Sequence, residues 1–259
     1  MKKILLLLCL STLVSCNAFK SGEELYAIGL DYLKGTNGQE QNMEKAAEYF
    51  KLAADKDHAP AQFNLGYSYL EGQGVPQSNS EAVYWFRKAA EQQHTFAQYN
   101  LGYCYKEGIG VEQNYREAIK WYTIAATKNI PDAQVELGNC FLHGLGTIPN
   151  PTEAAKWYKE AAERGHMQAQ SNLGVCYIIG QGVAIDYQLG LEWLSRAAAQ
   201  GHVEATRMVA ETAYNIALSF ENGEEISQDT EKAIQFYQVA AEYGSEEAQQ
   251  ALSRLGVLQ

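Results

Sequence analysis

Positive charge is scarce in this 259-residue sequence. It contains 20 lysines and arginines against 31 aspartates and glutamates, so its formal net charge is -11. Proteins that bind nucleic acid carry clustered basic residues, because contacts to phosphates supply much of their affinity. An acidic chain repels phosphates and anionic headgroups. The composition therefore excludes a nucleic-acid partner. It favours solubility and does not identify any other partner.

Long apolar runs are also missing, except near the N-terminus. A membrane-spanning helix needs about 20 consecutive apolar residues, and the run Ile4–Val14 is shorter than that. No transmembrane helix is predicted. Since Met1-Lys2-Lys3 precedes this run, residues 1–15 are interpreted as a secretory signal peptide.

Motifs of common catalytic sites are absent. No G-x-S-x-G, H-E-x-x-H, C-x-x-C or phosphate-loop pattern occurs. His143 stands alone, and the other four histidines occupy one position of a repeat, too far apart to share a zinc ion; they are His58, His94, His166 and His202. The sequence predicts a protein that is not an enzyme, with no catalytic residue, metal site or cofactor.

Cysteine is sparse, and one cysteine ends the signal segment. Leu13-Val14-Ser15-Cys16 resembles the bacterial lipobox, whose cysteine becomes the first mature residue and receives acyl chains. Two or three such chains anchor a protein durably. The alternative is an ordinary signal peptide with an incidental cysteine. We expect lipidation at Cys16, a short tether over residues 16–23, and, because Asn17 rather than Asp follows, an outer-membrane location facing the periplasm.

The remaining mature cysteines are Cys104, Cys140 and Cys176. Each follows Leu-Gly-x in the repeat, and stacked repeats should separate them by about 10 Å, beyond the roughly 7 Å Cα separation that a disulfide tolerates. We predict free, buried thiols.

What the sequence has in abundance is a repeat of 36 residues, which is best identified before any single helix. The segments that show it are NLGYSYLEGQGV from Asn64, NLGYCYKEGIGV from Asn100, ELGNCFLHGLGT from Glu136 and NLGVCYIIGQGV from Asn172. A Trp followed by Phe, Tyr or Leu, and then an Ala-Ala pair, recurs in the same phase.

Weaker copies flank these four repeats. The units are predicted near residues 24–58, 59–94, 95–130, 131–166, 167–202 and 203–245, with a C-terminal cap at 246–259 and a solenoid that fills 24–259. The sixth unit is longer by seven residues around Arg207 to Tyr214. Seven residues are close to two helical turns, so the insertion can lengthen a helix without rotating its apolar face.

Each unit is predicted to form two antiparallel helices. The first ends at a Gly-x-Gly loop, such as Gly72 to Gly74, where positive φ is needed. The second begins at a small polar cap, Asn79 or Ser80 in the second unit and Asn150 in the fourth. A glycine in the middle of every first helix but the last, such as Gly66, predicts close packing against an aromatic residue. The predicted fold is an all-α solenoid of about six helix pairs.

The pattern A-x-x-x-L-G-x-x-Y-x-x-G-x-G-V, followed by A-x-x-W-[FY]-x-x-A-A, resembles the Sel-one-like repeat, a relative of the tetratricopeptide repeat. This resemblance implies a right-handed superhelix whose first helices line a concave groove. It also implies an adaptor or recognition scaffold, often exported by bacteria. Gly190 and Ala217 depart from the usual Ala and Gly. A cysteine-rich subgroup described as penicillin-binding carries a second cysteine per unit, which this chain lacks.

A helical wheel with 100° per residue identifies the side chains that point away from each hairpin's own core. The predicted groove residues are Tyr26, Phe63, Tyr67, Phe96, Tyr99, Tyr103, Lys106, Asn139 and His143. The groove margin is predicted at Asn64, Asn100 and Asn172, where amides could bond a peptide backbone. The alternatives are that the aromatic residues pack on neighbouring units and that the asparagines form a solvated flank.

The leading hypothesis is a scaffold anchored in the cell envelope that binds a peptide or protein in its groove and touches the membrane only through the lipid on Cys16. The first alternative is a surface-exposed virulence factor that binds a host protein. The second is a weak penicillin-binding or β-lactamase-like activity, although no S-x-x-K or K-T-G motif occurs.

Overall fold

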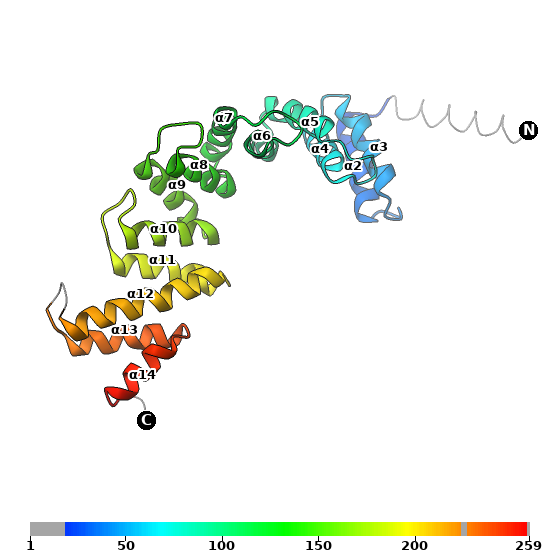
Figure 1. Cartoon of the computed structure of the whole chain (residues 1–259). Coiled ribbons are helices and arrows are strands. Elements are labelled where there is room, and N and C mark those ends of the chain that lie inside the picture. Colours follow the sequence, from blue (N-terminus) through cyan, green and yellow to red (C-terminus); the bar gives the residue numbers. More distant parts are fainter. Residues whose placement is uncertain (1–18, 224–226, 258–259) are drawn as a thin grey trace, which may run out of the picture. The chain divides into compact units, whose positions relative to one another are not determined.

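The computed structural model describes residues 19–223 and 227–257, and over these ranges the chain forms thirteen helices and no strand (Figure 1). This confirms the predicted all-α solenoid of helix pairs. No helix within these ranges is long and apolar enough to cross a membrane. The predicted signal peptide and Cys16 lie outside the described residues.

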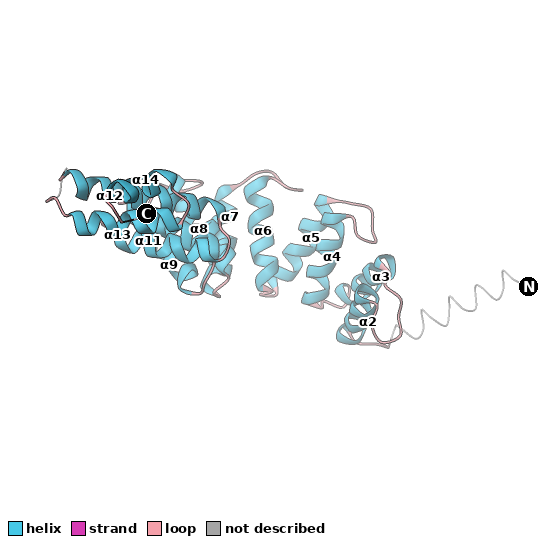
Figure 2. Cartoon of the chain, turned by 90° about the horizontal axis from the view of Figure 1, so that it is seen from below, coloured by secondary structure: helices cyan, strands magenta, loops and turns pink. Residues whose placement is uncertain are grey.

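The chain divides into two compact units, which meet in sequence between Ile130 and Pro131. The first unit contains three helix pairs (Figure 2): α2 (Gly22–Lys34) with α3 (Met43–Ala54), α4 (Ala59–Glu71) with α5 (Asn79–Glu91), and α6 (Thr95–Glu107) with α7 (Tyr115–Thr127). Within this unit α3 also packs on α4, and α5 packs on α6.

The second unit contains three pairs and a cap. They are α8 (Pro131–His143) with α9 (Pro151–Glu163), α10 (Met167–Ile179) with α11 (Tyr187–Ala199), α12 (Val203–Asn222) with α13 (Thr230–Glu242), and the closing helix α14 (Glu246–Arg254). α14 packs against α13.

The helix ends follow the repeated polar and glycine positions. Four first helices begin after a histidine whose side chain accepts the backbone N–H three residues on, as His94 Nδ1 does from Ala97 at 3.2 Å. Second helices begin after Asn, Ser or Asp, and Asn150 is such a cap as predicted. The cap of α5 is Ser78, which precedes both predicted candidates, Asn79 and Ser80, because its hydroxyl accepts the N–H of Glu81.

Glycine permits two kinds of close contact. A Cβ on Gly66 would lie 2.7 Å from Cδ1 of Phe86, which confirms the expected packing of an aromatic ring on the first helix. In the loops, Gly110 has φ +68° and a Cβ there would lie 2.2 Å from the carbonyl oxygen of Asn79. The loop backbone thus rests directly on the second helix of the preceding pair.

A buried glutamine near the start of first helices ties neighbouring pairs together. Gln62 Nε2 donates to the carbonyl of Ala54 at 3.2 Å, and Gln62 Oε1 accepts from Gln92 Nε2 at 2.8 Å. Gln170 repeats both bonds in the second unit, to Ala162 and from Gln200. These amides replace water at the joint between pairs, so the joint is both apolar and hydrogen-bonded.

The sixth pair contains the predicted insertion. α12 has 20 residues where α10 has 13, and it is one continuous helix. Its buried residues Ala205, Val209, Ala213 and Ala217 stay four residues apart. The insertion therefore lengthens the helix and keeps its apolar face, as two whole turns should.

Candidate partner-binding surfaces

The most exposed aromatic side chains among the predicted groove residues lie on α4 and α6. The exposed fractions are 56% for Phe96, 45% for Tyr67 and 37% for Tyr103. Tyr67 and Tyr103 occupy one position of successive first helices. Phe63 is half-buried beside them: its ring centroid lies 6.4 Å from that of Phe96, and it also packs inward, 5.9 Å from Phe86 and 4.7 Å from His94. We call these four residues the α4–α6 aromatic surface.

Lys106 places a charge next to this surface. Its ammonium nitrogen lies 5.9 Å from the ring centroid of Tyr103 and 3.2 Å from a carboxylate oxygen of Glu107. A cation over an aromatic ring is attracted by the ring's negative face. This contact orders one end of the aromatic surface.

Two predicted groove tyrosines pack inward instead of standing free. The ring of Tyr26 lies 5.7 Å from Phe50 and 4.8 Å from His58, and its hydroxyl accepts from Asn64 Nδ2 at 3.3 Å. Burial raises the pKa of Tyr26. The ring of Tyr99 is half-buried, 5.9 Å from that of Tyr122.

In the second unit the predicted polar residues hold structural contacts. Asn139 Oδ1 accepts from the hydroxyl of Tyr158 at 2.7 Å, and Asn172 Oδ1 accepts from Gln168 at 2.9 Å. Burial is the main cause that raises the pKa of Tyr158. His143 is exposed at the end of α8, and Asn100 in the first unit is half-buried.

The three described cysteines are buried thiols outside any disulfide, each on a first helix. Burial raises the pKa of Cys104 and of Cys176 to about 11. A thiol that stays protonated is a poor nucleophile. Within the described ranges, no group of His, Cys, Asp and Glu residues is arranged to hold a metal ion.

The sequence did not predict two cavities in the second unit that adjoin the lengthened α12. One, of about 820 Å³, lies between α12 and the start of α14, and the other, of about 900 Å³, is lined by residues of α10 to α13. The seven-residue insertion was the signal that could have located them.

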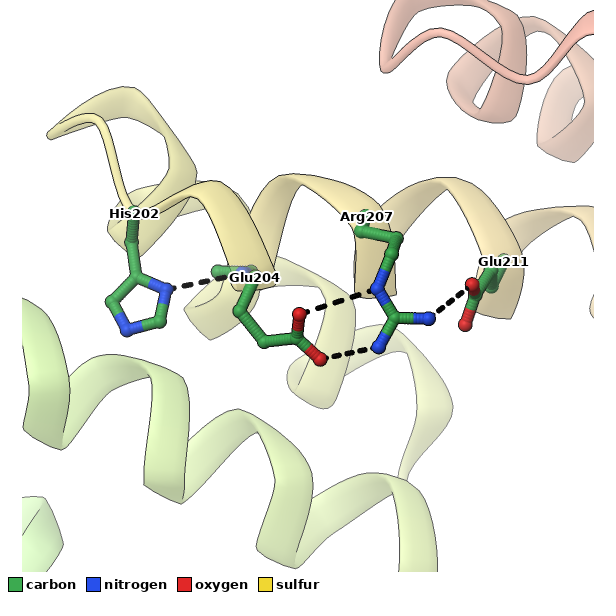
Figure 3. A network of polar contacts seen from close by, with 5 residues as sticks. His202, Glu204, Arg207 and Glu211 are labelled. Atoms are coloured by element: carbon green, nitrogen blue, oxygen red, sulfur yellow. Dashed lines mark hydrogen bonds and ion pairs between the residues drawn. The ribbon is translucent and has the colours of Figure 1, made fainter.

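Charged residues at the first cavity pair with one another (Figure 3). Arg207 lies between Glu204 and Glu211, and its Nη1 is 2.5 Å from a carboxylate oxygen of Glu211. His202 caps the same helix by accepting the N–H of Ala205. The arrangement fixes the exposed face of α12.

Comparison with known proteins gives the family. The model of the Sel1 repeat matches residues 25–58, 59–94, 95–130, 131–166, 168–202 and 210–245, most of the chain. The chain belongs to the Sel1 repeat family. Sel1 repeat proteins serve as protein-interaction scaffolds, and the family is generally non-catalytic.

Two solved Sel1-type structures resemble this Sel1 repeat chain. A Sel1 repeat protein from Oxalobacter formigenes is 34% identical, covers 85% of each chain and has a TM-score of 0.68. The protein c5321, a protective antigen present in uropathogenic Escherichia coli strains, is 31% identical with a TM-score of 0.71. That match covers 90% of this chain but 56% of the antigen.

A plant protein shares a shorter stretch. The ERAD-associated E3 ubiquitin-protein ligase component HRD3B of Arabidopsis thaliana is 40% identical over 55 residues. These residues are 21% of this chain and 9% of the plant protein. The similarity is therefore limited to about a fifth of this chain.

Proposed function

We propose that this Sel1 repeat protein is a non-enzymatic scaffold that binds a peptide or protein on the α4–α6 aromatic surface. The exposure of Tyr67, Phe96 and Tyr103 on successive first helices supports this proposal. Large, rigid aromatic side chains lose little conformational entropy on binding and recur at the energetic centres of interfaces.

The half-buried Asn100 lies in α6 between Phe96 and Tyr103 in sequence. An amide carries both donors and an acceptor, so it can bond the backbone of an extended segment. Together, aromatic rings and an amide suit a polypeptide partner with apolar side chains.

Photo-crosslinking in cells tests this surface. A photoreactive residue placed at Tyr67 or Tyr103 should capture a discrete partner that mass spectrometry identifies. Tyr84 is the matched control, because it is 49% exposed but lies on the second helix α5. Capture from Tyr84 with none from Tyr67 and Tyr103 would move the binding surface to the second helices.

We further propose that the scaffold is anchored in the bacterial cell envelope through a lipid on Cys16 and faces the periplasm. The apolar run, the lipobox-like residues before Cys16 and the Asn that follows support this location. Cys16→Ser should move the protein from the membrane fraction to the soluble fraction. An unchanged distribution with no incorporation of labelled palmitate in the parent protein would contradict the anchor.

A second candidate is display on the outer cell surface with a host protein as partner. The 31% identity to a protective antigen of uropathogenic strains supports this second location. Protease treatment of intact cells separates the two locations, because a periplasmic protein is spared and a surface protein is digested.

A further inference from the structure

The lengthened helix α12 meets its two neighbours in different registers. Toward the preceding pair it is regular: His202 Nε2 lies 3.2 Å from Gln168, 34 residues earlier, as His166 Nε2 does from Asp132. Its contacts with α13 match those of the other pairs only when the residues of α12 are counted back from its C-terminal end. The ring centroids of Tyr214 and Tyr237 lie 5.7 Å apart, and those of Tyr99 and Tyr122 lie 5.9 Å apart. In both pairs the two tyrosines are 23 residues apart in sequence.

The two registers differ by the seven inserted residues, which is about 10 Å along the helix axis. The last two turns of α12 and the α13 residues beside them therefore extend past the start of α11. A recess forms at this offset, with a volume of about 900 Å³. We call it the offset pocket.

Apolar side chains form most of the walls of the offset pocket: Ile178, Tyr187, Ile216, Phe220, Phe236 and Val239. The rings of Phe220 and Phe236 are stacked with centroids 5.8 Å apart. The side chain of Tyr187 is 49% exposed. This volume is within the usual range for a small ligand or a few side chains of a peptide.

Among the described residues that line the offset pocket, Lys232 is the only charged one. Its ammonium nitrogen lies 5.3 Å from the ring centroid of Phe220 and 3.5 Å from Oδ2 of Asp229. Asp229 is already engaged as the cap of α13, because its Oδ1 accepts the N–H of Lys232 at 3.0 Å. The side chain of Lys232 is 57% exposed, so a carboxylate from a partner can approach it at the edge of the aromatic stack.

We propose that the offset pocket binds a short peptide segment in which apolar side chains flank an acidic residue. The apolar side chains occupy the space between Tyr187 and Phe236, and the carboxylate pairs with Lys232. The hydroxyls and amide of Thr212, Asn215 and Ser219 also line the pocket and can bond a peptide backbone. The hydrocarbon of an acyl chain cannot form hydrogen bonds with these polar groups, so a peptide fits the lining better.

The test measures fluorescence anisotropy with the full mature chain and three labelled peptides. They contain Leu-Glu-Phe, Leu-Gln-Phe and Ser-Glu-Ser at the same position between glycines. Leu-Glu-Phe should bind, Leu-Gln-Phe should bind about threefold to fivefold more weakly, and Ser-Glu-Ser should not bind, since an exposed ion pair is worth up to about 1 kcal/mol.

Two variants locate the site. Tyr187→Ala should weaken the binding of the Leu-Glu-Phe peptide. Lys232→Gln should also weaken the binding of the Leu-Glu-Phe peptide, but it should leave the binding of the Leu-Gln-Phe peptide unchanged. Tyr84→Ala, which removes an equally exposed tyrosine of α5, should change neither. Equal thermal melting of the variants checks that each is folded.

Two results would overturn the proposal. One is no binding of Leu-Glu-Phe at about millimolar concentration, the weakest useful affinity. The other is binding that survives Tyr187→Ala and Lys232→Gln unchanged. If that residual binding is lost in Phe96→Ala, the peptide binds the α4–α6 aromatic surface, so the offset pocket fails while the proposed scaffold function stands.

Discussion

Gln98 shows what a single departure from the repeat does. It donates to the carbonyl of Ala90 as Gln62 does to Ala54, but the position that supplies Gln92 to Gln62 holds Lys128 here. Lys128 Nζ instead donates to the carbonyl of Gln93 at 3.0 Å. Among the described residues nothing donates to Gln98 Oε1, a buried acceptor whose desolvation is uncompensated.

Lys128→Gln should restore the missing bond and stabilise the chain by about 1 kcal/mol, the usual net contribution of a hydrogen bond. Denaturant unfolding followed by circular dichroism measures the change. Lys120→Gln, at an exposed position of the same helix α7, is the control and should leave the midpoint within error. A midpoint that does not rise for Lys128→Gln would mean that the acceptor is already satisfied.

His94 makes the stability depend on pH. Burial, and secondarily the charge of Lys128, lowers the pKa of His94 below its ordinary value. The folded state thus favours the neutral ring, whereas the unfolded chain binds a proton near pH 6.5. This contribution is complete above the unfolded pKa and is lost as the pH falls from about 6.5 through the folded pKa.

The melting temperature should therefore fall on acidification with a steeper slope in the parent protein than in His94→Asn. Asparagine caps α3, α7 and α9 in this chain, so it can keep the cap of α6. The variant also loses the contact between the rings of His94 and Phe63, whose centroids lie 4.7 Å apart. This loss lowers the melting temperature equally at every pH, so it does not change the slope. Parallel curves between pH 7 and 5 would contradict the assignment.

The exposure of individual groove residues was only partly predictable. A helical wheel treats each helix alone, so it placed both Tyr26 and Tyr67 on the side that points away from the hairpin's own core. In the structure, Tyr26 contacts His58, the last residue of its own repeat, and Asn64 of the next repeat, while Tyr67 remains 45% exposed. Contacts between repeats decide exposure, and a single helix's sequence does not contain them.

At the scale of helices, the repeat predicted the structure well because each pair reuses the same local rules. Caps, glycine loops and the Ala-Ala positions fixed the number of helices and the uninterrupted length of α12. The offset pocket was not predicted. The seven-residue insertion marks where the two registers diverge, but the residues that line the pocket come from four helices, and the repeat pattern does not contain the packing between them.

Deletion of residues 206–212 tests the role of the insertion. The deletion joins Ala205 to Ala213 and restores the spacing of the other first helices, in which Ala97 is followed by Gln98 and Tyr99. The protein should remain folded, with a helical content lower only by the missing turns. It should lose binding of the Leu-Glu-Phe peptide, because the offset that forms the pocket is gone.

Deletion of five residues, 206–210, is the matched control. Five residues rotate the following face by about 140°, whereas seven return it to within about 20°. The shorter deletion should therefore be the more harmful, with α13 and α14 detached from the stack. Equal stability of the two deletions would show that the phase of α12 does not matter.

Across the whole molecule, several repeats bury a small side chain at the same position of the first helix. In three repeats this residue is a cysteine, whose reactivity can be measured. Cys104 lies in the first unit, and Cys140 and Cys176 lie in the second, all buried. With pKa values of about 11, Cys104 and Cys176 hold little thiolate at neutral pH.

Alkylation at pH 8 should be at least about 100-fold slower at these cysteines in the folded protein than in urea, both because the thiolate is scarce and because the sulfur is covered. Mass spectrometry of digested samples resolves each site. Since repeat units are stabilised mainly by their neighbours, labelling of Cys104 and Cys176 can begin at different urea concentrations. Rapid native labelling of either would contradict its burial.

The lengthened α12 also breaks the equivalence of the helix pairs. A partner that recognises only the positions shared by all repeats can bind in several alignments, one repeat apart. The second unit contains a single extended first helix, so a partner that fits the recess beside it has one alignment available. If a long partner occupies the offset pocket as proposed, the insertion fixes where along residues 131–245 that partner begins.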